Sequence, residues 1–380
     1  MRLALVFHGV HKRGGVERSI WEAARHWQHH HEVTIVAADV DRTELDDVAV
    51  RQVDIGDVAQ AGAVTAGLWR FGRAASRLYS VSEFDHVISF GVQPVPATVA
   101  WVGSVHRAWL QAGRRLHEGG LRRHPVLRYA LPRHQERLVL ERSYFHRPWS
   151  RVVVVADQVG SDLERLYGVD AGVVRTVHNG FNPAEFDPAR RSERGTARAA
   201  WGLPEDAIVV CMVANELSRK GFEVAVRALA EVNANSSAAP MHLVLAGTAD
   251  PAAYAPLIDE LQAAATVHWV GPLGDVGGLH AACDAFVLPT KYEAFCMAIV
   301  EALGSGLPVI TTTVPGAGDL IEHGVNGLLQ HDPNDVAELA GLLAQLLDEP
   351  TRQRLTAGAA PSVAELTWPA VLDRAVTLLG

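Results

Sequence analysis

Two glutamates stand eight positions apart in the segment KYEAFCMAIVEALGSGLPVITT, residues 291–312. Glu293 and Glu301 lie in a run that is otherwise apolar and that ends at glycine and proline. If residues 293–301 were all helical, the carboxylates would be about 12 Å apart along the axis and about 80° apart around it. They suit two hydroxyl-bearing parts of one elongated ligand, because a carboxylate accepts hydrogen bonds from a diol. The alternative is that both point to water from one helix face.

Two adjacent cations precede a predicted helix in the string ANELSRKGFEVAVRALA. Arg219 and Lys220 come shortly after the predicted strand Ile208–Val213, and Glu293 comes shortly after the predicted strand Ala285–Leu288. Ligands of open α/β sheets bind at the carboxyl edge, where such loops meet. Arginine offers a fork and lysine a point charge to phosphate oxygens, so the pair fits an anion site. The alternative is two solvated loop cations, which the pair by itself would favour.

A glycine-rich loop, HGVHKRGGVERS, follows the first predicted strand and leads into a helix. The N-terminus of a helix behind such a loop binds anions through its free N–H groups and its dipole. The loop contains no G-x-G-x-x-G motif, and the P-loop spacing fails because Gly15 and Val16 stand where Lys and Ser or Thr are required. Gly14 and Gly15 could therefore hold a phosphate without forming either known motif, and a plain tight turn is the alternative.

Short β-branched runs alternate with amphipathic stretches such as 15–27, 222–233 and 335–347, which predicts parallel sheets covered by helices. At 380 residues, two domains are expected. The polar segment 182–204 is predicted to be the linker, and 366–380 a final amphipathic helix. The predicted strands are Leu3–Phe7, Val33–Ala37, His86–Phe90, Val152–Val155, Val173–His178, Ile208–Val213, His242–Ala246, Val267–Val270, Ala285–Leu288 and Val309–Thr312.

Charge is distributed unevenly along the chain. Residues 1–180 carry 23 Lys and Arg against 19 Asp and Glu, whereas residues 181–380 carry 11 against 24. The acidic second half argues against broad nucleic-acid binding. Segment 107–151 has eleven arginines and three acids, so it fits either an anionic acceptor or lipid surface or a solvated helix pair. No run of 18 apolar residues occurs and the three cysteines are sparse, so we expect a cytoplasmic protein, with peripheral contact at the inner face of the plasma membrane through this segment.

Taken together, the motifs resemble those of the retaining glycosyltransferases of family 4, which have the GT-B fold. Glu293-x7-Glu301 resembles the family's E-x7-E signature, and four further motifs agree in order: GGVE at 14–17, VHNGFNP at 177–183, SRKG at 218–221 and GVNGLL at 324–329. The resemblance implies two Rossmann-like domains facing a central cleft. Residues 1–182 would bind the acceptor, 183–365 would bind the nucleotide-sugar donor, and the helix at 366–380 would cross back to the first domain.

The resemblance also implies a role for each matching residue of the donor site. Arg219 and Lys220 would neutralise the diphosphate, and Glu301 would take the ribose hydroxyls. The transferred sugar would be held by Glu293 and by the backbone N–H groups of the next three residues, Ala294, Phe295 and Cys296. Backbone groups around Gly271 and Leu273 would pair with the base.

On the acceptor side, the resemblance implies that Gly14, Gly15 and Glu17 close over the donor phosphate and the acceptor. His106 stands where the family often has an active-site histidine, and it would contact the sugar or acceptor near the reaction centre. Such enzymes generally need no bound metal, so we expect no metal ligand and no cofactor beyond the nucleotide sugar. A histidine run at 29–31 is interpreted as a connecting loop.

Two positions depart from the family pattern. Asn215 stands where many members have an arginine, which moves phosphate binding toward Arg219. Cys296 stands where the second residue of a Phe-Gly pair is usual, and a larger side chain under the sugar is expected to alter the choice of donor. Asn215 with SRKG, and the segment RHQERLVLERSYF at 133–145, are closest to the lipopolysaccharide and cell-surface branch.

We therefore expect an enzyme of the hexosyltransferase type. It would move a sugar from a nucleotide diphosphate sugar, UDP favoured, to a hydroxyl of a glycan, a glycolipid or a secondary metabolite. Two alternatives remain at this point: a nucleotide-sugar 2-epimerase on the same fold, and a non-catalytic sugar-binding protein.

Overall fold

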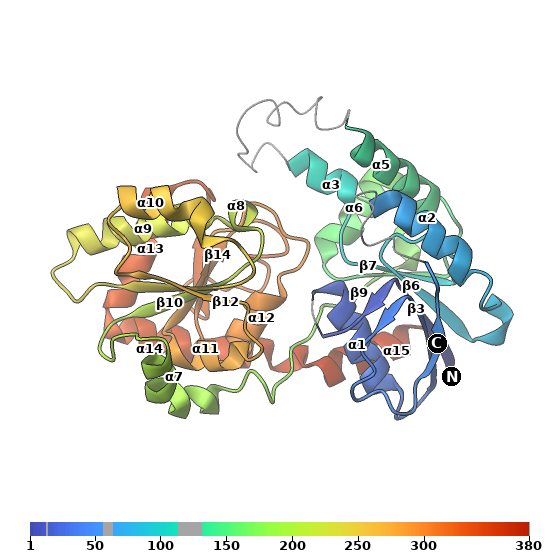
Figure 1. Cartoon of the computed structure of the whole chain (residues 1–380), viewed down its shortest axis with the longest axis horizontal. Helices are drawn as coiled ribbons and strands as arrows, with labels where there is room; N and C mark the ends of the chain where they lie inside the picture. Colours follow the sequence, from blue (N-terminus) through green and yellow to red (C-terminus); the bar gives the residue numbers. More distant parts are fainter. Residues whose placement is uncertain (13, 56–63, 113–130, 380) are drawn as a thin grey trace. The chain divides into compact units, whose positions relative to one another are not determined.

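The computed structural model describes residues 1–12, 14–55, 64–112 and 131–379, and the chain divides into two compact units. Among the described residues, the first unit contains those up to Gly180 together with the C-terminal helix from Trp368. The second unit contains Phe181–Thr367. Each unit is built on a parallel sheet with helices on its faces, which confirms the predicted α/β class (Figure 1).

The sheet of the first unit has the strand order β5-β3-β1-β6-β7-β8-β9, and its pairings are all parallel. The order reverses between β1 and β6, which are neighbours. This reversal is the topological switch point of a Rossmann-like sheet, where the loops at the carboxyl ends of the strands part and leave a crevice. The strands are Arg2–Val6 (β1), Glu32–Ala37 (β3), Ala49–Gln52 (β5), His86–Phe90 (β6), Val99–Val102 (β7), Arg151–Val154 (β8) and Val174–Thr176 (β9).

Helices of the first unit include one from the far end of the chain. Trp27 Nε1 in α1 donates a hydrogen bond of 3.2 Å to the carbonyl of Leu372 in α15, and His26 Nε2 lies 2.7 Å from Asp373. Figure 1 shows α15 in red beside α1 in blue, so the prediction that the C-terminal helix returns to the first unit is confirmed. The helices are Val16–Trp27 (α1), Val64–Ala75 (α2), His106–Gln111 (α3), Pro132–Phe145 (α5), Asp157–Tyr167 (α6) and Trp368–Leu379 (α15), with short β2 (Gly9–Val10) and β4 (Asp39–Val40) pairing outside the main sheet.

The sheet of the second unit repeats the same topology in the order β12-β11-β10-β13-β14-β15, again with parallel pairings. Its switch point lies between β10 and β13. Central strands such as Ala285–Leu288 are buried along their whole length, as expected when helices cover both faces of a parallel sheet. The strands are Val209–Val213 (β10), His242–Ala246 (β11), Val267–Gly271 (β12), Ala285–Leu288 (β13), Val309–Thr312 (β14) and Gly327–Gln330 (β15).

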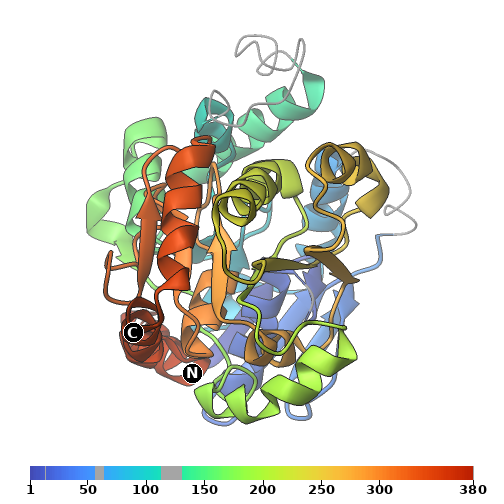
Figure 2. The same cartoon turned by 90° about the vertical axis from the view of Figure 1, so that its left-hand side faces the viewer.

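Helices cover the sheet of the second unit, and Figure 2 shows α9 and α13 side by side in front of the strands. Their apolar residues, among them Phe222 and Leu339, are fully buried. The helices are Arg194–Ala200 (α7), Leu217–Lys220 (α8), Phe222–Asn235 (α9), Ala255–Glu260 (α10), Val276–Ala282 (α11), Met297–Gly304 (α12), Val336–Ala344 (α13) and Glu349–Ala359 (α14). No helix in the described ranges is long and apolar enough to cross a membrane.

The prediction of a linker at 182–204 is wrong, because this segment is a folded part of the second unit. It forms a 3-10 helix at Pro188–Glu193 and then α7. Arg194 and Arg198 both form ion pairs with the buried Asp284, at 2.9 and 2.8 Å, and Arg191 binds the same carboxylate. The segment is polar because it contains these arginines, and their ion pairs with Asp284 hold it against the second unit.

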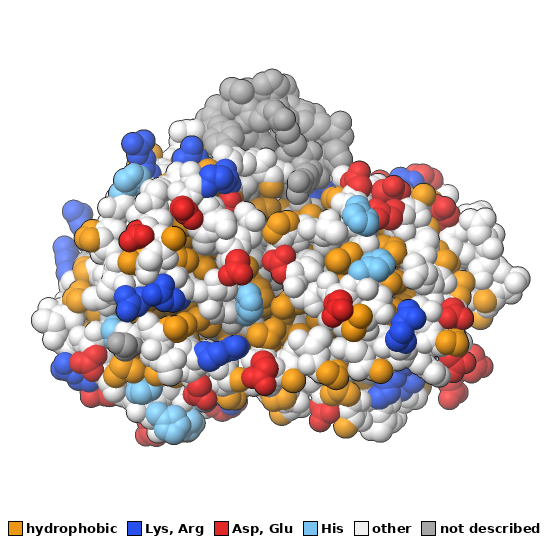
Figure 3. Space-filling view, turned by 180° about the vertical axis from the view of Figure 1, so that it is seen from behind, with side chains coloured by type: hydrophobic (Ala, Val, Ile, Leu, Met, Phe, Trp, Pro, Cys, Tyr) orange, Lys and Arg blue, Asp and Glu red, His pale blue; other side chains and the backbone are white. Residues whose placement is uncertain are grey.

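Three strands of the two main sheets, β5, β7 and β15, were not predicted, and neither were the two-residue strands β2 and β4. β7 is only four residues long and follows a proline-containing turn, so it carries little periodicity. β15 begins at Gly327, which weakens the β signal, yet a side chain there would collide with the carbonyl oxygen of Val309 on the neighbouring strand. The charge asymmetry is visible on the face drawn in Figure 3, where acidic side chains gather over the second unit.

Candidate functional site

The switch point of the second unit carries the predicted cations and the first predicted carboxylate. Arg219 and Lys220 end the single-turn helix α8, which follows β10. Gly221 then adopts a left-handed conformation with φ of 80°, and a side chain there would collide with the carbonyl oxygen of Pro289 after β13. Only glycine allows this close approach, which brings the loop after β10 against the loop after β13.

Arg219, Lys220 and Glu293 form one compact ionic network. Arg219 Nη1 lies 2.9 Å and Lys220 Nζ 2.5 Å from the same oxygen, Glu293 Oε1. The hydroxyl of Thr290 donates to that oxygen at 3.0 Å, and Arg219 also donates to the carbonyl of Tyr292 at 2.7 Å. The side chains are 19%, 12% and 6% exposed, so two largely buried cations share one buried carboxylate. The excess positive charge suits an anionic ligand.

Both cations remain charged at neutral pH. Burial alone lowers the pKa of Arg219, but Glu293 and Glu216 outweigh it and the pKa is raised. Burial also lowers the pKa of Lys220, and Cys296 and Glu293 raise it more strongly. Because burial raises the pKa of the Cys296 thiol, that group is protonated at neutral pH. The carboxylate of Glu293, 2.5 Å from Lys220 Nζ, is then the interaction that raises the pKa of Lys220.

Cys296 lies inside the network rather than beside it. Its Sγ is 3.6 Å from Lys220 Nζ, and the residue is 3% exposed. Its backbone N–H donates a 3.1 Å hydrogen bond to the carbonyl of Gly316, so the prediction that this N–H binds the sugar does not hold in this structure. A side chain at Gly316 would come within 2.5 Å of the carbonyl oxygen of Ala294, which is why two loops pack closely enough to form that bond.

The second glutamate, Glu301, lies in the middle of α12. Glu293 is 8% exposed and Glu301 7% exposed, which excludes the alternative that both carboxylates point to water. Phe295, like Ala294, is half-buried in the loop between β13 and α12, so the predicted sugar-binding loop directly precedes the helix that carries Glu301.

Loops after β10, β11 and β12 are tied together near the predicted base-binding region. The side-chain oxygen of Asn215 accepts hydrogen bonds from the N–H and the hydroxyl of Thr248, at 2.9 and 3.1 Å. The carbonyl of Gly271 accepts a 2.9 Å hydrogen bond from the N–H of Gly247. Asn215 thus connects two loops. Gly271 is the last residue of the edge strand β12, and Leu273 follows that strand.

In the first unit, the predicted glycine loop lies between β2 and α1. Gly14 has a φ of 89°, and a side chain on it would come within 2.5 Å of the carboxylate of Glu17. Gly15 caps α1, and the Ser19 hydroxyl donates to its carbonyl at 2.8 Å and lies 3.2 Å from Asn179 of the VHNGFNP motif. Glu17 therefore folds back over Gly14 and closes the loop.

His106 begins α3, just after β7, and several groups fix it. Its backbone N–H donates to Glu141 Oε1 at 2.5 Å, and its Nε2 is 3.0 Å from His134 Nδ1. The ring stacks against both Trp109 and His134, with centroids 5.5 and 5.1 Å away, and those two rings also contact each other at 5.8 Å. Glu141 is buried, and burial raises its pKa despite the hydrogen bonds that it accepts. It serves as the cap of α3 from a different helix.

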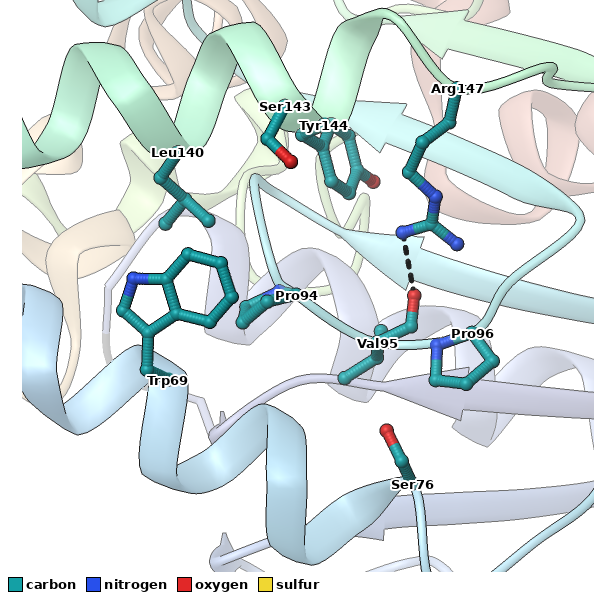
Figure 4. A pocket seen from close by; sticks show the side chains of 9 residues that line it. All are labelled: Trp69, Ser76, Pro94, Val95, Pro96, Leu140, Ser143, Tyr144 and Arg147. Carbon is teal, nitrogen blue, oxygen red and sulfur yellow. Dashed lines mark hydrogen bonds between the residues drawn. The ribbon is translucent and has the colours of Figure 1, made fainter.

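A groove of about 360 Å³ lies elsewhere in the first unit, between α2 and α5. It exists because the connection from β6 to β7 has no helix, and Pro94 and Pro96 form its floor instead (Figure 4). Trp69 and Leu140 form one wall, and Arg147 donates to the carbonyl of Val95 at 2.8 Å. Its lining has no carboxylate or carboxamide, the groups that suit sugar hydroxyls, so the candidate site remains at the carboxyl edges.

Two family models together match most of the sequence. The model described as Glycosyltransferase Family 4 matches residues 13–185, and the model described as Glycosyl transferases group 1 matches residues 193–360. The chain belongs to the family 4 glycosyltransferases.

Curated relatives of this glycosyltransferase include two that are named as inositol phosphate glycosyltransferases. The D-inositol 3-phosphate glycosyltransferase 2 of Catenulispora acidiphila is 34% identical over 53% of this chain and 49% of its own length. The D-inositol 3-phosphate glycosyltransferase of Thermomonospora curvata is 32% identical over 59% of this chain and 55% of its own length. The chain thus matches these curated relatives over about half of their length.

Solved structures show that this glycosyltransferase has the GT-B fold. WaaG, a glycosyltransferase involved in lipopolysaccharide biosynthesis, has a TM-score of 0.82 at 20% identity, with 99% of each chain covered. Anabaena Alr3699/HepE in complex with UDP and glucose has a TM-score of 0.74 at 18% identity, covering 100% of this chain and 99% of the other.

Sequence reasoning missed several residues that shape the site. Thr290 completes the binding of Glu293, and Glu141 caps the helix that begins with His106. Thr290 follows Pro289 and directly precedes the segment KYEAF, so its position next to the motif was the available sequence signal. Glu141 acts over 35 positions of sequence, and nothing local in RHQERLVLERSYF distinguishes it from the neighbouring glutamate Glu136.

Proposed function

We propose that this glycosyltransferase transfers a sugar from a nucleotide diphosphate sugar, UDP favoured, to a hydroxyl acceptor with retention of configuration. The observation that carries the proposal is the buried network of Arg219, Lys220 and Glu293. The two cations share a single buried carboxylate, and the second partner of Arg219, Glu216, is 66% exposed to water, so inside the crevice positive charge is left for a diphosphate. The UDP named in the solved Alr3699/HepE complexes supports the choice of nucleotide.

In the proposed reaction, Arg219 and Lys220 stabilise the negative charge that develops on the leaving diphosphate. They are held in place before the donor arrives, so little reorganisation is needed when the sugar–phosphate bond breaks. Glu293, with the backbone of Ala294 and Phe295, holds the transferred sugar. Glu301 takes the ribose hydroxyls, and the backbone near Gly271 and Leu273 takes the base.

The acceptor would be bound by the first unit. Gly14, Gly15 and Glu17 would lie near the donor phosphate and acceptor, and His106 would contact the sugar or acceptor near the reacting atoms. In this reaction the acceptor oxygen bonds to the anomeric carbon as the sugar–phosphate bond breaks on the same face, and the leaving phosphate oxygen takes the hydroxyl proton. No protein nucleophile is then needed on the opposite face of the sugar. We expect no bound metal to be required, so an excess of EDTA should leave turnover unchanged.

Membrane contact is a separate part of the proposal. Segment 107–151 would place arginines against anionic lipid at the cytoplasmic face, and 113–130 within it lies outside the described residues. Co-sedimentation with vesicles containing phosphatidylglycerol, compared with pure phosphatidylcholine vesicles, tests this directly.

The function is tested in two steps. A thermal-shift screen with UDP, GDP, ADP and TDP identifies the nucleotide, because specific binding raises the melting temperature by mass action. The matching nucleotide sugars are then incubated with an acceptor panel: D-inositol 3-phosphate, a lipopolysaccharide core oligosaccharide, a hexose phosphate and a phenolic aglycone. NMR of the product gives the anomeric configuration. Inversion would contradict retention, and free epimerised sugar without transfer would indicate the 2-epimerase instead.

A further inference from the structure

The first unit has its own switch point, between β1 and β6, and its loops differ in chemistry from those of the second unit. His8 follows β1, and Gln93 follows β6. Their side chains meet, with Gln93 Nε2 3.2 Å from His8 Nδ1. Because the carboxyl ends of adjacent parallel strands lie at one edge, this pair occupies the crevice position of the sheet.

One end of the Gln93 amide has no partner. Gln93 is 1% exposed, and its Oε1 is buried without a hydrogen bond. If the amide oxygen and nitrogen of Gln93 were exchanged, the atom that faces away from His8 would still be buried without a hydrogen bond. Leaving such a group buried and unpaired costs about 1–3 kcal/mol. A methionine of similar size would avoid that cost, so stability alone does not explain a glutamine here.

The loop after β1 contributes a second unsatisfied atom. Nδ1 of His11 is buried and has no hydrogen-bond partner. The ring lies against Gly9, where an added Cβ would be 3.5 Å from His11 Nε2 and 3.8 Å from Glu17 Cγ. Two unpartnered polar atoms thus come from the loops on the two sides of one switch point, next to the predicted acceptor residue Glu17.

Gln93 carries no charge, and the surroundings of His8 favour its neutral form. Burial lowers the pKa of His8, against the opposing effect of Glu17, and Arg137 and His11 act in the same direction as burial. A neutral imidazole and a carboxamide offer both donors and acceptors, and a hydroxyl can serve either role. An isolated phosphate would instead require the positive charge seen at the switch point of the second unit.

We propose that Gln93, together with His8 and His11, binds a non-reacting hydroxyl of the acceptor and so selects which polyol is glycosylated. This inference rests on the proposed function. It goes beyond it by assigning acceptor recognition to residues outside the family motifs.

The test compares Gln93→Met with Gln330→Met. Gln330 is a matched control in the second unit, since it is fully buried and also has an unpartnered Oε1. Its Nε2, however, donates to the carbonyls of Asp332 and Asp335 at 2.7 and 2.8 Å, so it holds a loop. We expect Gln330→Met to lower the melting temperature and leave the acceptor KM unchanged. Gln93→Met should keep or raise its melting temperature, because it removes the unpaired oxygen together with the hydrogen bond to His8. It should raise the acceptor KM about tenfold, the loss of one hydrogen bond.

Kinetics use the acceptor of the panel above that is turned over fastest, together with its monodeoxy analogues. Wild type should discriminate against one analogue about tenfold, and Gln93→Met should not distinguish that analogue from the parent acceptor. Equal discrimination by both proteins for every analogue would overturn the inference, whatever the melting temperatures. Failure of the proposed function looks different: wild type would show neither a nucleotide-induced thermal shift nor transfer to any acceptor.

Discussion

The two units have the same strand order around the switch point, but the side chains on their loops there differ in charge. In the second unit, Arg219, Lys220 and Glu293 form a buried ionic network. In the first unit, Gln93 and His8 form an uncharged pair. The backbone topology therefore determines where a ligand can bind, and the side chains on the loops determine whether that ligand is an anion or a polyol.

The ionic network is poorly explained by stability alone. Buried ion pairs repay their desolvation cost only with good geometry, and apolar residues of similar volume often stabilise as well or better. The single-turn helix α8, the left-handed Gly221 and the hydroxyl of Thr290 all serve to hold charges at a crevice. The comparison predicts that disturbing the second unit affects donor chemistry, and the following changes test it in order of expected effect.

The largest effect is expected for Lys220→Ala and Glu293→Ala. Each should lower kcat by roughly 10²–10³-fold, because preorganised charge at the leaving group is removed. Steady-state transfer assays measure this, and circular dichroism verifies folding. Glu216→Ala is the control, since Glu216 pairs with Arg219 at 3.0 Å but is 66% exposed, and its loss should change kcat little. Wild-type turnover in both test variants would contradict the assignment.

A smaller effect, on stability, is expected for Asp284→Asn. Burial raises the pKa of Asp284, but the N–H of Val209 and the arginines outweigh it and the pKa is lowered. The stabilisation is thus present above the unfolded pKa of about 3.9 and is lost as pH falls through the folded value. At pH 7 the variant should lose about 1.5–3 kcal/mol of unfolding free energy.

Urea unfolding of wild type and Asp284→Asn from pH 7 down to pH 3 measures that difference. The difference should stay constant down to about pH 4 and should begin to shrink between pH 4 and pH 3, because the unfolded state then binds a proton that the folded carboxylate does not. A difference that did not shrink below pH 4 would show that the carboxylate charge does not stabilise α7 against the sheet.

Gly221→Ala should lower the free energy of unfolding by more than the strain of a left-handed backbone at alanine accounts for. That conformation costs a non-glycine residue about 1–2 kcal/mol. Gly168→Ala is the control, because Gly168 has a φ of 68° and open space around its Cβ position, whereas a Cβ at Gly221 meets the carbonyl of Pro289. Chemical denaturation should therefore show the larger loss for Gly221→Ala, with weaker nucleotide binding as well. Equal losses in the two variants would argue against a tight contact between the loops.

The smallest effect is expected for Cys296→Ala. The thiol is buried against Lys220 at 3.6 Å and contributes volume rather than charge. Stability should change little, and the ratio of kcat/KM between two hexose donors should shift by about tenfold, the effect of a small change in pocket volume. An unchanged ratio for UDP-glucose, UDP-galactose and UDP-N-acetylglucosamine would exclude a role in donor choice.

Much of the fold could be predicted because each buried strand is a short run of β-branched residues. His242–Ala246, Ala285–Leu288 and Val309–Thr312 agree with the predicted strands to the residue. The segment 182–204 was misjudged because its order depends on Asp284, about 90 positions later. The composition of a local segment gives no information on a partner so distant in the sequence.

The candidate site divides in the same way. Arg219, Lys220 and Glu293 were identified because motif and position after a strand agree, and the structure brings them into contact. Gln93 belongs to no motif, and it was singled out only because its amide oxygen is buried without a hydrogen-bond partner. That property exists in three dimensions and has no signature in the sequence.

The central claim is that a nucleotide diphosphate binds at the switch point of the second unit. The most direct measurement is the thermal shift caused by UDP in wild type, Lys220→Ala and Gln93→Met. At about 100 times Kd, binding should add about 2.7 kcal/mol and raise the melting temperature of wild type and Gln93→Met alike. Lys220→Ala should lose most of that shift at the same concentration. An equal shift in all three proteins would contradict the claim.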